Sequence, residues 1–327
     1  MHRRRSASAI TLAALFMAGC TADPAAGPAA TTAPASGVLL LDALAHVADS
    51  DATRTRFEFS DIAFLGTMQG EGWADIRYLG ARNISLLLVQ RAGLPVDAAS
   101  YAITAGPEPR QVIVLAGGQD ATTATAALRQ LGWRADGDRF LAPLLTAKSP
   151  DTDNDGGLIP LGQARQSGAD LLVGGTTADL ADAAPAAGRP TLVVRPVVAA
   201  LAGCLGDVVA AKARFMPHVS GPQIYLGVAA TGVRRPATPD AKPRVVLCAA
   251  HDSAATATQT AETLRHAFAN DASNGVPYTQ LYSDVTVTVL DGPQHIVRAE
   301  ATAATPNTML YAFGGYSLPG EVGQGDV

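Results

Sequence analysis

Three aspartates at alternate positions are the candidate metal ligands of this sequence. Asp151, Asp153 and Asp155 are followed by Gly156. Carboxylates at positions 1, 3 and 5 of a loop, with glycine at position 6, can surround a calcium ion. A complete loop also needs a bidentate acid at position 12, where this chain has Gly162. The segment therefore predicts an acidic surface turn, with weak calcium binding as the alternative and no cofactor expected besides calcium.

Residue types that could form a hydrolase triad occur together only at His251, Asp252 and Ser253. A working triad needs side chains that converge from separate segments, and three consecutive residues cannot normally aim at one another. We therefore expect Asp252 or Ser253 to cap a helix instead. The sequence contains no GxSxG, HExxH or CxxC pattern, so the common signatures of serine hydrolases, zinc proteases and thiol redox enzymes are missing.

Paired carboxylates could also act on glycosides, and four acidic residues lie close together in the sequence: Glu58, Asp61, Glu71 and Asp75. A chain with 29 acidic residues offers many such pairs, and its two tryptophans give a sugar little to stack against. We expect no catalytic residues. A hydrolase whose active site matches no motif is the alternative.

The first 20 residues read as an export signal. Arginines at positions 3–5 form a positive region, and residues 9–19 form an apolar stretch too short to cross a bilayer permanently. The stretch ends in Phe-Met-Ala-Gly-Cys, which resembles the lipobox of bacterial lipoproteins, with Phe16 where leucine is usual. The resemblance implies that the signal peptide 1–19 is removed and that Cys20 carries a diacylglycerol.

The expected location follows from that lipid. Acyl chains on Cys20 hold a protein to a membrane without spanning it, and residues 20–37 form a flexible tether rich in alanine and proline. The net charge of −5 becomes more acidic when the three arginines are removed. An acidic body is repelled by anionic lipid and excludes nucleic acid as a partner. We expect an exported protein on the outer face of the cell membrane, with the membrane as a partner through its lipid anchor.

Two cysteines remain once Cys20 is lipidated, and an even pair in an oxidising compartment indicates a disulfide. Cys204 lies on the apolar stripe of an expected helix over 196–214, and Cys248 lies on an expected buried strand. A helix packed on its sheet can bring the two within bridging distance. We predict a Cys204–Cys248 disulfide, with two separate buried thiols as the alternative.

The folded body is expected to begin at residue 38. Residues 38–47 and 52–66 show helical apolar spacing, and four apolar residues of the second segment are expected in the core: Phe57, Phe59, Ile62 and Leu65. A strand over 170–174, a helical segment over 177–186 and the helix over 196–214 are expected near the middle of the chain.

An order of elements occurs twice around these segments. In the first module, covering 38–216 with its connecting helices, we expect strands over 99–104 and 111–116, a helix over 121–131 capped by Asp120, and a strand over 138–143. In the second, 217–327, we expect strands over 223–230 and 244–249, a helix over 254–268, and a hairpin from 285–290 to 295–303.

The hairpin alternates apolar with polar residues, which gives each strand one wet face. We predict an α+β fold of two related β-β-α-β modules, with antiparallel or mixed sheets and helices packed on one face. Interleaving of the two modules into one domain is the alternative.

The whole chain resembles the uncharacterised secreted lipoproteins of high-GC actinobacteria in its alanine content, its excess of arginine over lysine, and segments such as LAGGQDATTATAALRQLGW and LAGCLGDVVAAK. The resemblance implies an extracytoplasmic lipoprotein and supplies no catalytic residues. We expect a lipid-anchored binding or structural module of the cell envelope, with an envelope protein or a small ligand as partner. An envelope hydrolase and a calcium-dependent surface module are the alternatives.

Overall fold

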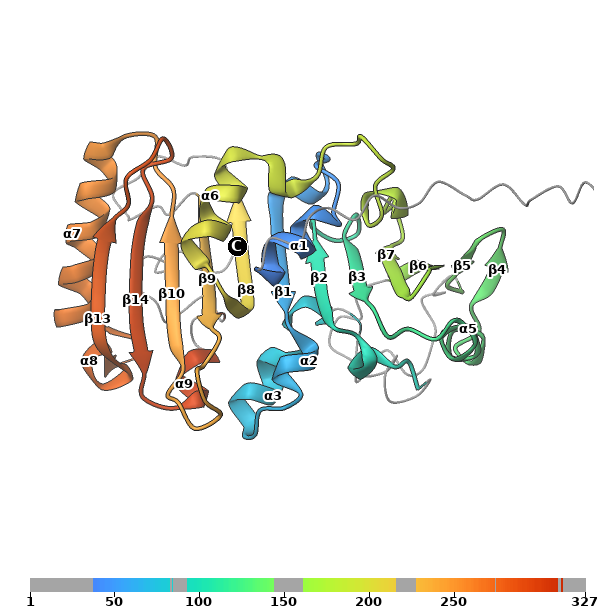
Figure 1. Ribbon diagram of the computed structural model, residues 1–327, viewed down its shortest axis with the longest axis horizontal. Helices are drawn as coiled ribbons and strands as arrows, with labels where there is room; N and C mark the ends of the chain where they lie inside the picture. The colour runs from blue at the N-terminus through green and yellow to red at the C-terminus, as the bar shows by residue number, and fades with distance from the viewer. Residues whose placement is uncertain are drawn as a thin grey trace, which may run out of the picture. The chain divides into compact units, whose positions relative to one another are not determined.

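A twelve-stranded antiparallel sheet is the framework of the protein (Figure 1). The computed structural model describes residues 38–82, 84, 93–143, 161–215, 228–273, 275–310 and 313. All of these lie in one compact unit, which spans residues 33–327. The strand order is β13-β14-β10-β9-β8-β1-β2-β3-β7-β6-β5-β4, and every neighbouring pair is antiparallel.

The elements fall into two halves. The first half contains α1 (Leu39–Ala45), β1 (Arg56–Ser60), α2 (Ile62–Leu65), α3 (Glu71–Arg77), β2 (Tyr101–Ala105), β3 (Val112–Ala116), α5 (Ala121–Gln130), β4 (Arg134–Asp136), β5 (Arg139–Leu141), β6 (Leu161–Ser167) and β7 (Asp170–Gly175). The second half contains α6 (Pro196–Leu205), β8 (Val208–Phe215), β9 (Val228–Arg234), β10 (Arg244–Ala249), α7 (Ala254–Asn270), β11 (Ala272–Ser273), β12 (Val276–Pro277), α8 (Tyr278–Leu281), β13 (Tyr282–Val289), β14 (Val297–Ala303) and α9 (Pro306–Leu310).

The order of strands in the sheet is the same on both sides of its centre. Counting outward, the first half reads β1-β2-β3-β7-β6 and the second reads β8-β9-β10-β14-β13. In each half one helix precedes the first strand, and another follows the third strand: α1 and α5, then α6 and α7. The hairpin of β4 and β5 extends the first half beyond β6, and the described part of the second half ends at β13.

Helices cover both faces of the sheet, which corrects the expectation of a single covered face. Helices α1 and α6 share one hydrophobic core with residues such as Phe57 and Val114, whereas α7 and α5 each cover a separate core. Ile113, which directly precedes Val114 on β3, belongs to the core under α5. Because successive strand residues point to opposite faces, α5 lies across the sheet from α1. Strand β3, which is covered on both faces, is therefore a continuous apolar run.

The outer strands keep the one wet face that was expected. Strand β14 alternates between buried and half-buried residues along its whole length. Val297, Ala299 and Ala301 face the core under α7, while Arg298 and Glu300 are half-buried on the other side. The mixed α+β class and the antiparallel sheet are thus confirmed.

Two segments expected as helices contain strands. Residues 56–60 form β1, on which Phe57 and Phe59 point to the same face and are fully buried. The helix expected over 196–214 ends at Leu205, where Gly206 takes a left-handed φ of 65°, and the chain continues as β8. The apolar start of β8, which is buried on both faces, has no periodicity that separates strand from helix.

Other expected elements are found with small shifts. Asp120 caps α5, and Ser253 caps α7 by accepting a hydrogen bond from the Thr256 amide. The helical segment expected over 177–186 is only a 3₁₀ turn, η4 (Leu180–Asp182). Strands β4 and β6 were not expected, and the part of the predicted strand over 223–227 lies outside the described residues.

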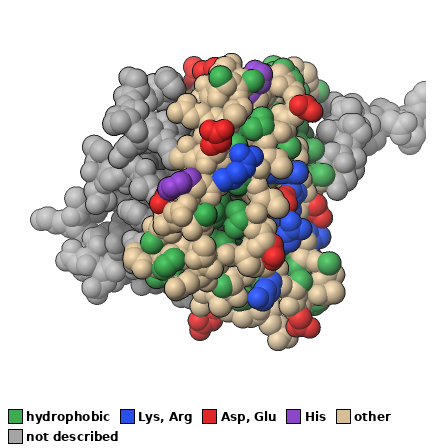
Figure 2. All heavy atoms as spheres, turned by 90° about the vertical axis from the view of Figure 1, so that its left-hand side faces the viewer, with side chains coloured by type: hydrophobic (Ala, Val, Ile, Leu, Met, Phe, Trp, Pro, Cys, Tyr) green, Lys and Arg blue, Asp and Glu red, His purple; other side chains and the backbone are tan. Residues whose placement is uncertain are grey.

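The surface at the β13 end of the sheet is mixed in character. Figure 2 shows hydrophobic side chains there in small groups between charged and polar ones. The large hydrophobic residues that are exposed in the described chain are Val194, Val276 and Val289. Isolated residues of this kind are normal on protein surfaces and mark no docking patch.

Candidate functional site

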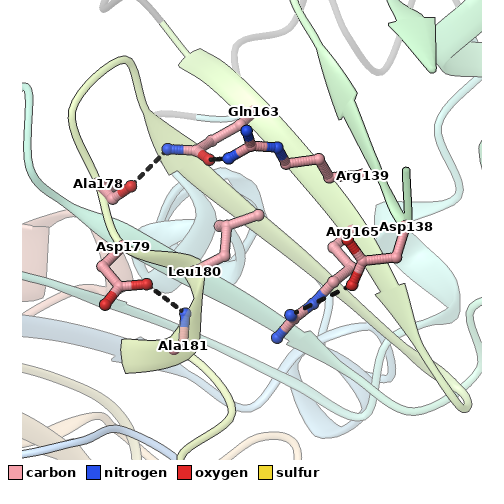
Figure 3. Close-up of a pocket in the computed structure, with 8 residues that line it drawn as sticks. All are labelled: Asp138, Arg139, Gln163, Arg165, Ala178, Asp179, Leu180 and Ala181. Atoms are coloured by element: carbon pink, nitrogen blue, oxygen red, sulfur yellow. Dashed lines mark hydrogen bonds and ion pairs between the residues drawn. The ribbon is translucent and has the colours of Figure 1, made fainter. Parts of the chain in front are cut away.

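A pocket of about 200 Å³ lies on the extension of the first half, between strands β5 and β6 and the segment 178–181 (Figure 3). It is smaller than the roughly 300–1,000 Å³ clefts that hold drug-sized ligands. Eight residues line it: Asp138, Arg139, Gln163, Arg165, Ala178, Asp179, Leu180 and Ala181.

Strand pairing places the polar residues of the pocket on one face. Gln163 pairs with Gly174 and Arg165 pairs with Leu172 across the β6–β7 ladder. Paired residues of an antiparallel ladder share a face, and Leu172 belongs to the core under α1 and α6. The pocket therefore lies on the α1 and α6 face of the sheet, at its β4 end.

The segment 178–181 is held against the sheet by Gln163. This side chain is buried, and its Nε2 donates hydrogen bonds to the Gly175 carbonyl at 3.2 Å and the Ala178 carbonyl at 2.5 Å. The close approach of this segment to the sheet also requires glycine at position 174. A Cβ at that position would lie 2.9 Å from both Ala178 Cβ and Leu180 Cδ2. The wall of the pocket is thus fixed at its first residue.

The far end of the same wall is fixed by a buried carboxylate. Asp182 accepts a hydrogen bond from Ser50 Oγ at 2.6 Å and forms an ion pair with Arg189. The Ala48 amide donates to the Asp182 carbonyl at 2.8 Å. A wall that is anchored at both ends keeps the pocket preorganised, which limits the entropy lost on binding.

The charged groups of the pocket differ in how they are paired. Arg139 bonds Asp136 at 3.1 Å, and its Nη1 also points to Gln163 Oε1 at 3.4 Å. Among the described residues, the ion-pair partner of Arg165 is Asp138, at 3.5 Å. One oxygen of Asp179 accepts from the Ala181 amide at 3.0 Å, and within the described part of the chain no cationic side chain forms an ion pair with it.

This chemistry suits binding more than catalysis. None of the eight lining residues is a serine, cysteine, threonine, histidine or lysine, so the lining offers no hydroxyl, thiol, imidazole or amine group for catalysis. Two guanidinium groups, two carboxylates and one amide can instead hold a polar molecule by charge-assisted hydrogen bonds. Leu180 and the two alanines supply a small apolar surface beside them.

The residues singled out from the sequence are not among the eight that line the pocket. Cys20 and the candidate calcium ligands Asp151, Asp153 and Asp155 lie outside the described residues. In the ranges that the structure does describe, no group of three or more histidine, cysteine, aspartate or glutamate side chains could hold a metal ion.

The His251, Asp252 and Ser253 run does not form a triad in this structure, because Ser253 is occupied as the cap of α7. His251 is half-buried, and its burial, together with the nearby His295, lowers its pKa despite the charge of Asp252. Burial of this kind disfavours the charged imidazolium.

The four acidic residues that lie close together in the sequence, from Glu58 to Asp75, either stabilise the fold or face solvent. Asp61 caps α2 and pairs with Arg235 at 2.6 Å. Glu58 lies on β1 opposite Thr104 and Lys212. Glu71 and Asp75 are exposed on α3. They form no carboxylate pair around a cleft.

The predicted Cys204–Cys248 disulfide is present and joins the end of α6 to β10. Next to it, Arg234 donates hydrogen bonds to the Leu205 and Cys204 carbonyls and pairs with Glu300. Burial opposes ionisation of Glu300, but the hydrogen bond and charge of Arg234 outweigh it, so the pKa of Glu300 lies below its usual value. The Arg234 guanidinium group therefore caps the carbonyl groups in the last turn of α6.

Sequence reasoning missed the pocket completely. Its polar residues match no motif, because they come from a hairpin and two further segments that only the sheet brings together. The one available signal was the alternation of Gln163 and Arg165 with small residues in LGQARQS, which is typical of a strand with one wet face.

Comparison with known proteins identifies no relative that shares this site. In the described residues, no helix combines the length and apolar character that a membrane span requires. The chain matches no family model, no curated protein and no solved structure.

Proposed function

We propose that this protein is a lipid-anchored, extracytoplasmic binding module of the cell envelope, and that it binds a small polar ligand in the pocket between β5, β6 and segment 178–181. The observation that carries the proposal is the lining of guanidinium, carboxylate and amide groups beside a wall that is anchored at both ends. Polar groups that are held by strands and hydrogen bonds are suited to recognition.

The position of the pocket in the fold supports the same function. Five strands of each half follow the same order, and among the described residues the additional hairpin of β4 and β5 belongs to the first half alone. We infer that the halves are two related modules, each beginning with its helix, so that β8 belongs to the second module. Arg139 and Asp138 come from the additional hairpin and its turn, which makes the pocket a feature of one module only.

The lipid anchor rests on the lipobox-like residues that end at Cys20. Cells that express the full chain would be grown with an alkyne-tagged fatty acid. We expect the wild-type protein to carry the tag and to associate with membranes. The Cys20→Ala variant, after removal of its signal peptide, should do neither. A tether variant, Thr31→Ala, serves as the control. Wild-type protein without the tag would contradict the anchor.

The binding function can be tested by thermal unfolding with a defined panel of small polar metabolites of either charge. A ligand at about one hundred times its Kd stabilises a fold by about 2.7 kcal/mol, which raises its Tm measurably. We expect at least one compound to raise the Tm of the wild type and not of Arg165→Ala. The exposed α5 variant Arg129→Ala is the matched control. A panel without any pocket-dependent shift would contradict the proposal.

A further inference from the structure

We propose that the ligand of this pocket is a small zwitterion, of the chemical class of α-amino acids with short side chains, with its ammonium group on Asp179 and its carboxylate on Arg165. This inference rests on the proposed binding function and adds the class of ligand. It is carried by the distribution of paired and unpaired charges around a small cavity (Figure 3).

Asp179 is the carboxylate that a cationic group would satisfy. Its Oδ1 accepts the backbone hydrogen bond from Ala181, which leaves Oδ2 without a bond among the described residues. Ionised carboxylates bind ammonium groups by charge-assisted hydrogen bonds that are stronger than neutral ones. The side chain sits on the anchored wall, so a cation bound here would face β6.

Arg165 carries the guanidinium group that can bind an anionic group of the ligand. Its contact to Asp138 is 3.5 Å long, and the side chain of that aspartate is 77% exposed against 27% for Arg165. Exposed pairs of this length are screened by water and stabilise little. A ligand carboxylate that approaches from inside the pocket can therefore bond Arg165 at little cost in lost pairing.

Ligands with a single charge fit the same lining less well. A free anion near Arg165 would also face Asp138 and Asp179, which line the same pocket. A free cation near Asp179 would also face Arg139 and Arg165. A zwitterion places one charge against each partner, and like-charge contacts are what a specific site uses to exclude other ligands.

The size and apolar part of the pocket limit the side chain of the ligand. The cavity volume is about 200 Å³, and Ala178, Leu180 and Ala181 line its remaining surface. These residues offer contact to a methyl or similarly short group.

The test uses three probes that share an ethyl or ethylidene unit and differ in their charged groups: L-alanine, propionate and ethylamine. Propionate lacks the ammonium group, and ethylamine lacks the carboxylate. Their Kd values for the full mature chain would be measured by ligand-observed NMR. We expect L-alanine to bind at least about tenfold more tightly than either single-charge probe, since two charge-assisted contacts are made instead of one.

Variants assign each half of the ligand to its partner. Asp179→Asn should weaken L-alanine about tenfold without weakening propionate, while Arg165→Ala should weaken L-alanine similarly without weakening ethylamine. Loss of a like charge should, if anything, let the single-charge probe bind more tightly. Arg165→Lys, which keeps the charge, should bind with intermediate strength and covers the case that Arg165→Ala does not fold. Exposed residues supply the controls Asp75→Asn and Arg129→Ala, which should bind like the wild type.

The possible outcomes separate the inference from the proposed function. If propionate or ethylamine binds as tightly as L-alanine, or if the variants weaken all three probes equally, the zwitterion is wrong. The binding function stands in that case when another metabolite stabilises the wild type and not Arg165→Ala. If no compound depends on the pocket, both proposals fail together.

Discussion

Cys204 and Cys248 lie with their Cα atoms 6.2 Å apart and form a disulfide between the last turn of α6 and the end of β10. Both side chains are buried in the core that α1 and α6 share. The bond therefore fixes the helix that covers the second half of the sheet to a strand two positions away from β8, the strand that begins that half.

Removal of this disulfide should lower the free energy of unfolding substantially. The bond spans 44 residues, and the chain-entropy model assigns a loop of that size about 4 kcal/mol. We expect the double variant Cys204→Ala/Cys248→Ala to lose about this much in guanidinium unfolding. Reductant should destabilise the wild type and leave the double variant unchanged. Equal midpoints for wild type and double variant would contradict the prediction.

Two glycines should respond to alanine in opposite directions. At Gly174 a Cβ would meet Ala178 and Leu180 at 2.9 Å, so Gly174→Ala should overpack the wall and cost about 1–3 kcal/mol. At Gly203, exposed in α6, no neighbouring atom lies within 4 Å of the added Cβ. Gly203→Ala should therefore stabilise the helix by up to about 1 kcal/mol. Urea unfolding of both variants provides the comparison, and destabilisation by Gly203→Ala would count against it.

Loss of the Gln163 amide should loosen the wall of the pocket. Gln163→Ala removes the donor to the Gly175 and Ala178 carbonyls. Buried acceptors left without partners cost about 1–3 kcal/mol. Hydrogen exchange should show faster exchange at residues 178–182 in particular. The exposed α7 variant Gln259→Ala should match the wild type, and unchanged exchange in Gln163→Ala would show that another contact holds the wall.

Glu300 should contribute a stability that depends on acid pH. Its pKa in the folded chain lies below the ordinary 4.5 because the hydrogen bond and charge of Arg234 outweigh burial. The unfolded chain therefore binds this proton more tightly, so the contribution is complete above about pH 4.5 and is lost as pH falls through the folded pKa.

Denaturant midpoints of wild type and Glu300→Gln should consequently differ at neutral pH and approach each other on acidification. Glu262→Gln, an exposed change on α7, should follow the wild type across the whole range. A constant difference between wild type and Glu300→Gln at all pH values would show that the carboxylate charge is not the cause.

Sequence patterns predicted the elements whose residues alternate or carry a cap. Strand β10 was expected over 244–249 and spans those residues, and α5 and α7 begin after their predicted caps, Asp120 and Ser253. Helix α1 was also expected. These signals are local, because a cap or a stripe is set by residues within a few positions of one another.

The patterns failed where burial on both faces removes the periodicity. β8 is apolar on both sides along VVAA, and it follows α6 after only two residues. The two together were therefore expected as one long helix. The pocket was not predicted for a different reason. Its lining depends on the pairing of β5 with β6 and on the packing of segment 178–181 against these strands, and no local pattern encodes either.

The central pairing of β1 with β8 has a consequence for how the protein is made. Arg56 pairs with Arg214 across more than 150 residues of chain, so the inner edge of the first half has no partner until β8 has left the ribosome or crossed the membrane. Contacts of such long range form slowly, and an unpaired strand edge is prone to aggregation. The fold therefore favours a route that keeps the chain unfolded until residue 215 is available.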